Sequence, residues 1–101
     1  MKDGIAKFEN LNVWQESFNL SVEIYKLIKD CSDYGLKDQI VRSSLSVPSN
    51  IAEGHDRNND KEFVRFLNYS KASCGELRTQ IYFCMEIGLI ENAKAKELID
   101  K

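Results

Sequence analysis

Four polar side chains recur along one stretch of the chain at spacings that place them on one side of a helix. Arg42, Ser46, Asn50 and Glu53 step by four, four and three residues, so they share a helix face. A guanidinium, a hydroxyl, an amide and a carboxylate arranged in this way can form a contact surface for an anionic partner. They can equally form a hydrogen-bonded network that fixes helix register, with Glu53 paired to an arginine. We favour the network and keep the contact surface as the alternative.

A second candidate is basic. Arg57, Lys61 and Arg65 recur every four residues and can form a ridge that contacts phosphates. Three carboxylates lie among them between residues 56 and 62, so a solvated helix face with nearly cancelled charge is the favoured interpretation. The candidate contacts for nucleic acid or another partner are Arg42, Arg57, Lys61, Arg65 and Arg78.

The sequence has few residues that could form a catalytic site. His55 is the one histidine, and the residue three positions before it is Ala52, so the Glu-x-x-His repeat of di-iron bundles is missing. The glycines do not form a phosphate-binding loop, and no serine lies in a nucleophile-elbow sequence. We therefore predict a protein that is not an enzyme, with no catalytic residue, no metal, no cofactor and no small-molecule substrate.

Composition narrows the class of protein further. The 101 residues suffice for one domain, and a net charge of −2 argues against a strongly basic nucleic-acid-binding domain. Cys31, Cys74 and Cys84 are an odd number without a C-x-x-C motif, which favours a reducing compartment. Neither a signal peptide nor a membrane span is visible, so we expect a cytoplasmic protein that does not contact a membrane.

The periodicity of the apolar residues predicts that helices position these side chains. Apolar residues recur at steps of three and four in four segments, with a polar tail over residues 1–10. Asn12 with Gln15, and Asn59 with Glu62, have the spacing of capping boxes. Pro48 removes a backbone hydrogen bond and predicts a kink in the second helix, or a division into two short helices. The expected helices cover about residues 12–31, 36–55, 60–87 and 91–101.

These elements predict an all-α fold with one domain over residues 1–101. The brief turns between segments indicate an up-and-down antiparallel four-helix bundle, with a second helix kinked at Pro48 and a short fourth helix. A sustained seven-residue repeat in the third helix is typical of helices packed nearly antiparallel.

Three runs of sequence resemble the signature of a bacterial family. They are LNVWQ at Leu11–Gln15, DQIVRSSLSVPSNIAEG at Asp38–Gly54 and KEFVRFLNYSKASCGELRTQ at Lys61–Gln80. By these runs the chain resembles the four helix bundle protein family, also called the 23S ribosomal RNA intervening-sequence protein family. That family includes the accessory variability determinant of diversity-generating retroelements. The family's polar motif would fall on Arg42, Ser46, Asn50, Glu53, Gly54, Arg57 and Glu76.

The resemblance implies a homopentamer of four-helix protomers without known catalytic activity, which binds nucleic acid or a reverse transcriptase. Two functions are therefore expected. The first is a non-enzymatic homo-oligomer that binds RNA, DNA or a ribonucleoprotein. The alternative is a protein–protein interaction module with no nucleic-acid role, which the net charge of −2 favours.

Overall fold

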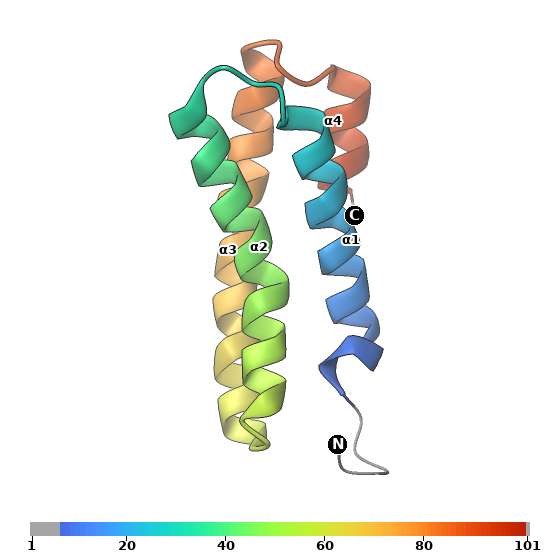
Figure 1. Cartoon of the computed structure of the whole chain (residues 1–101), viewed down its shortest axis with the longest axis vertical. Coiled ribbons are helices and arrows are strands. Elements are labelled where there is room, and N and C mark those ends of the chain that lie inside the picture. The colour runs from blue at the N-terminus through green and yellow to red at the C-terminus, as the bar shows by residue number, and fades with distance from the viewer. Residues whose placement is uncertain (1–6, 101) are drawn as a thin grey trace.

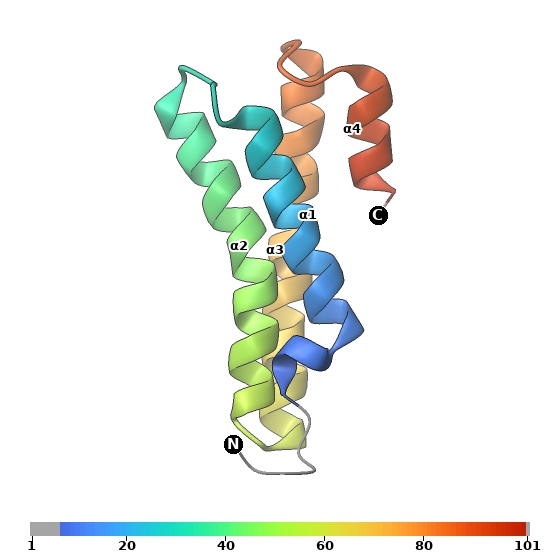
Figure 2. The ribbon, with the colours of Figure 1, turned by 45° about the vertical axis from the view of Figure 1, so that its right-hand side comes forward.

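The computed structural model describes residues 7–100, and within them four α-helices run up and down in sequence order without any strand (Figure 1). The helices are α1 (Asn12–Ile28), α2 (Tyr34–Asp56), α3 (Asp60–Glu86) and α4 (Asn92–Ile99), and a short 3-10 turn, η1 (Phe8–Asn10), precedes them. The predicted all-α four-helix bundle is confirmed. Its fourth helix is short, as expected, and lies beside the upper part of α3 (Figure 2).

One of the two helix caps predicted from the sequence is confirmed, and one further cap is found. Asn59 accepts a hydrogen bond from the backbone of Glu62 at 3.0 Å, which confirms the predicted cap of α3. Asp33 caps α2 through the backbone of Leu36 at 3.1 Å. The predicted cap at Asn12 is wrong, because Leu11 holds the N-cap position without a side-chain bond.

Within the expected N-terminal tail, residues 8–10 form the turn η1. Residues 1–6 of the tail lie outside the described part of the chain. Phe8 begins η1, and its ring packs edge-on against Trp14 with 5.3 Å between the ring centres. The side chain of Gln15 donates to the carbonyl of Glu9 at 2.8 Å. These contacts fold residues 8–10 back onto the start of α1 in place of an extended tail.

The buried core lies where all four helices meet. Ile24, Ile28, Ile40 and Cys84 are almost fully buried there, and each buried isoleucine stabilises the fold by roughly 1.5–3 kcal/mol. Ile90, Ala95 and Leu98 bring the α3–α4 connection and α4 onto the same cluster. In the part of the bundle away from α4, the buried residues lie at the interface of α2 and α3 (Figure 1).

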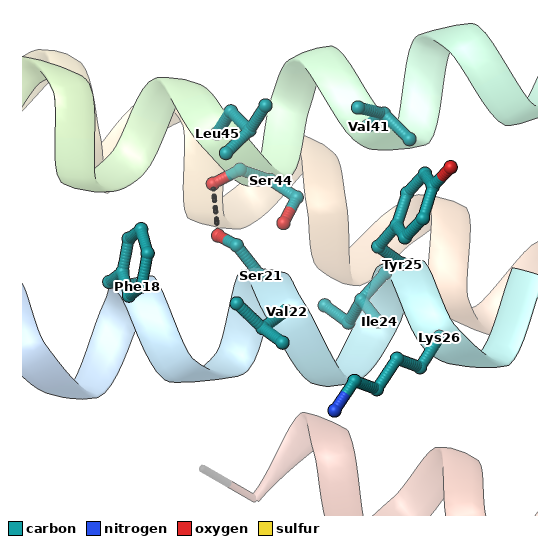
Figure 3. A pocket seen from close by; sticks show the side chains of 9 residues that line it. All are labelled: Phe18, Ser21, Val22, Ile24, Tyr25, Lys26, Val41, Ser44 and Leu45. Atoms are coloured by element: carbon teal, nitrogen blue, oxygen red, sulfur yellow. Dashed lines mark hydrogen bonds between the residues drawn. The ribbon is translucent and has the colours of Figure 1, made fainter. Parts of the chain in front are cut away.

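Pro48 lies inside α2, which continues through it from residue 34 to residue 56. The alternative of two short helices is therefore wrong, while the kink stays a prediction. Proline has no N–H, so the carbonyl of Ser44 loses its partner four residues on. The hydroxyl of Ser21 on α1 donates to that carbonyl at 3.0 Å (Figure 3). A side chain from the neighbouring helix thus satisfies the carbonyl that Pro48 leaves free.

Gly54 lies at a close contact between α2 and α3, and it has the closest neighbours of the described glycines. A Cβ atom at this position would lie 2.6 Å from the Cβ of Phe66 and 3.2 Å from the ring of Phe63. Real Cβ atoms do not come so close, and the Phe66 Cβ is fixed to the α3 backbone. Gly54 is therefore required by helix packing.

Candidate functional site

The polar face predicted on α2 carries charges that are paired within the helix. The guanidinium of Arg42 donates to Asp38 at 2.8 Å, and both side chains are exposed, Arg42 by 78 %. Glu53 pairs with Arg57 at 2.9 Å. These are ion pairs of the i,i+4 type in water, each worth roughly 0.2–1 kcal/mol. Glu53 therefore has an arginine partner, while the network that fixes helix register stays a prediction.

The uncharged residues of this face bond to backbone carbonyls. Ser46 donates to the carbonyl of Ser43 at 2.7 Å, and Asn50 donates to the carbonyl of Ser46 at 2.8 Å. All the bonds of this face lie within α2, so its four predicted residues do not converge on one pocket. Two side-chain bonds join α2 and α3: the hydroxyl of Ser43 donates to Glu76 at 2.7 Å, and the hydroxyl of Ser70 donates to the carbonyl of Val47 at 2.9 Å. Glu76 therefore helps to set the register of these two helices.

The basic ridge at the start of α3 is largely neutralised. Glu62 accepts from Arg65 at 2.7 Å and lies 3.7 Å from Arg57, and both guanidinium groups lie about 5 Å from the centre of the Phe66 ring. The hydrogen bond to Glu62 raises the pKa of Arg65. Arg57 and Arg65 could reach a phosphate only by leaving carboxylate partners, which agrees with the predicted cancellation of charge.

Other cations on α3 are unpaired. Lys61, Lys71 and Arg78 are exposed, and none of them forms an ion pair within residues 7–100. Sequence reasoning selected Lys61 and Arg78 but missed Lys71. Its seven-residue spacing from Arg78 was the available signal, because residues seven apart share a helix face.

An apolar groove lies between α1 and α2 (Figure 3). It has a volume of about 240 Å³, and Phe18, Val22 and Tyr25 of α1 lie opposite Val41 and Leu45 of α2, with Tyr25 beside Val41. Phe18 and Leu45 are 41 % and 47 % exposed, while the Lys26 side chain at the edge points away from α2. Such a surface suits apolar contacts with protein and offers no charge to a phosphate.

His55 is partly buried. It belongs to the last turn of α2, its side chain is 22 % exposed, and its ring lies edge-on to Phe63. Its Nδ1 atom is buried without a hydrogen-bond partner and lies 3.8 Å from a carboxylate oxygen of Asp56. Within residues 7–100 no hydrogen bond joins this ring to a serine, so the pair that a serine hydrolase needs is not formed.

The cysteines and carboxylates do not form a reactive cluster in the described chain. Over residues 7–100, no three His, Cys, Asp or Glu side chains are grouped so that they could hold a metal ion. Burial raises the pKa of the Cys74 thiol against the opposing charge of Arg78, and burial also raises the pKa of Cys84. Both thiols are therefore weak nucleophiles at neutral pH. No helix in this part of the chain has the length and apolarity to cross a bilayer.

The fold and these sites define a class, an all-helical bundle whose described residues form no catalytic constellation. The sequence profile of the family described as 23S rRNA-intervening sequence protein matches residues 9–101. The chain belongs to this family, as the sequence motifs predicted. A comparison with curated proteins gave no match.

Proposed function

We propose that this chain is a non-enzymatic, homo-oligomeric protein of the cytoplasm that binds RNA, DNA or a ribonucleoprotein partner. The observation that carries the nucleic-acid role is the set of exposed cations on α3 without carboxylate partners, Lys61, Lys71 and Arg78. Such side chains can neutralise phosphates without first breaking an ion pair. Family membership supports the same role through the ribosomal RNA in the family's description.

Assembly into a homo-oligomer, which we expect to be a pentamer, rests on the exposed apolar surface. Phe83 and Ile87 on α3 are 52 % and 54 % exposed, and the groove between α1 and α2 adds a second apolar area. A chain of 101 residues gains stability by covering such surfaces with another copy. Light scattering coupled to size exclusion tests this, and a single species near 11.6 kDa would contradict it.

The nucleic-acid role is tested by mobility shift with structured RNA, single-stranded RNA and duplex DNA. At low salt, about 50 mM, we expect a shifted complex that disappears as salt rises, because phosphate contacts release counterions. The absence of any complex at low salt would contradict the proposal.

A protein–protein module without nucleic-acid contact is the second candidate. The net charge of −2 and the apolar groove between α1 and α2 favour it. Crosslinking in the native host separates the two candidates: a protein partner without nucleic acid supports the second, and nucleic acid without a protein partner supports the first.

The cytoplasmic location rests on the cysteines. Cys31, Cys74 and Cys84 are free thiols, and free thiols persist in reducing compartments. Fractionation of the native host tests it.

A further inference from the structure

We propose that one stripe of α3 binds the backbone of a single-stranded nucleic acid, an inference that rests on the proposed nucleic-acid role. The α3 stripe consists of Lys61, Asn68, Lys71, Gly75, Arg78 and Tyr82, all of them exposed. Its residues follow one another by seven, three, four, three and four positions, so they stay on one side of the helix. At about 1.5 Å per residue the stripe is roughly 31 Å long, which is enough for several nucleotides.

Charge distinguishes the α3 stripe from the other exposed flank of α3. Between Lys61 and Tyr82 the stripe has three cations and no carboxylate, and Val64, which lies between its first two members, is uncharged; the exposed carboxylates of Asp60 and Glu86 adjoin its two ends. On the other flank, Arg65 is bonded to Glu62 and the carboxylate of Glu76 accepts from α2. The α3 stripe therefore attracts the phosphates of a nucleic acid that follows α3. The charges on the flank beside it are neutralised or negative.

The middle of the stripe is open to close approach. A Cβ atom at Gly75 would meet nothing within 4 Å, so packing within the chain does not require glycine there, in contrast to Gly54. A position without a side chain between Lys71 and Arg78 lets a ligand approach the helix backbone while both cations reach it from either side.

Two features favour a single strand over a duplex. The cations lie along one side of α3, which matches one phosphate backbone, whereas a duplex groove presents phosphates on both sides of a helix. Tyr82 ends the stripe with a ring that is 47 % exposed. An exposed ring can stack on an unpaired base, which a duplex does not offer.

The experiment measures fluorescence anisotropy of labelled oligo(U) and oligo(dT), each of about 12 nucleotides, and of a duplex of the same length. The stripe variant is K61Q/K71Q/R78Q. The control variant is R42Q/R57Q/R65Q, which removes the same three charges at positions where each cation has a carboxylate partner.

We expect the stripe variant to raise the Kd for a single strand at least about tenfold. Its slope of log Kd against log salt should fall by about 2, which is three contacts at about 0.7 each. The control variant should stay within about threefold of the wild type. Tyr82→Leu should weaken single-strand binding about tenfold and leave duplex binding unchanged.

The outcomes separate this inference from the proposed function. If the wild type binds no nucleic acid at low salt, the proposed function fails and the inference with it. If the wild type binds and the control variant loses affinity while the stripe variant does not, only the inference is overturned. Equal binding of duplex and single strand, or a stripe variant that dissociates in light scattering, also overturns it, since the surface would then be unspecific or a subunit contact.

Discussion

Replacing Ser21 by alanine should destabilise the bundle, because it removes the hydrogen bond to the carbonyl of Ser44. The two atoms lie 3.0 Å apart, and Ser21 and Ser44 are 6 % and 3 % exposed. The Ser21 hydroxyl also lies 3.0 Å from the carbonyl of Ser17. That carbonyl already accepts a bond in the regular pattern of α1, so the Ser44 carbonyl depends more on the single hydroxyl proton.

The loss of unfolding free energy in Ser21→Ala follows from the carbonyl that the substitution leaves without a partner. The carbonyl of Ser44 would be buried without a partner, since Pro48 supplies no N–H. An orphaned buried acceptor costs about 1–3 kcal/mol in the free energy of unfolding. Ser17→Ala is the matched control on the same helix. Its hydroxyl bonds only within α1, to Trp14 at 3.0 Å, and its loss should cost under about 0.5 kcal/mol.

A double-mutant cycle with Pro48→Ala isolates the cause. Alanine at position 48 restores an N–H that can bond to Ser44, so Ser21→Ala should cost about 1 kcal/mol less in that background than in the wild type. Urea unfolding at one fixed protein concentration measures all four variants, since the stability of a self-associating protein depends on concentration. Equal costs of Ser21→Ala in both backgrounds, within about 0.4 kcal/mol, would refute the reasoning.

Two glycines and one lysine give further tests. Gly54→Ala should lose about 1–3 kcal/mol of unfolding free energy, because its Cβ would lie 2.6 Å from the Cβ of Phe66; unchanged urea stability would contradict this. Gly75→Ala should gain about 0.5–1 kcal/mol in the same assay, since its Cβ has open space in a helix interior, and a loss would show that the position is packed. Lys94 bonds to Glu23 at 2.6 Å, which raises its pKa in the folded state. The stability that it contributes is complete below the unfolded pKa of about 10.4 and is lost as pH rises through the folded value. The stability gap between wild type and K94Q should therefore be constant near neutral pH and shrink as pH rises beyond the ordinary lysine pKa of about 10.4; a gap that does not shrink with rising pH would contradict the pairing.

Periodicity predicted the helices well because each helix carries apolar residues at helical spacing, and one set of them on every helix packs into a shared core. The continuity of α2 through Pro48 was not predictable from α2 alone. The carbonyl that Pro48 leaves free is satisfied by Ser21, which is 23 residues away in sequence. The sequence around Pro48 showed that the carbonyl of Ser44 lacks its backbone partner. Only the packing of α1 against α2 showed that the hydroxyl of Ser21 takes that place. Gly54 is similar, because its need for a glycine comes from Phe66 on another helix.

The candidate site was predictable where charges are close in sequence. Glu62 lies three residues before Arg65, so their pairing followed from helix geometry. Lys71 was missed because it has no cationic neighbour within one turn, and its exposure depends on which side of α3 the other helices leave open. The groove between α1 and α2 depends on the packing of two elements, so no single segment indicated it.

The salt dependence of oligo(U) binding by the wild type tests the central claim most directly. The account predicts binding at about 50 mM salt and a linear loss of log affinity with log salt, with a slope of about −2 if the three unpaired cations each contact one phosphate. Absence of binding at low salt, or an affinity that does not change with salt, would contradict it.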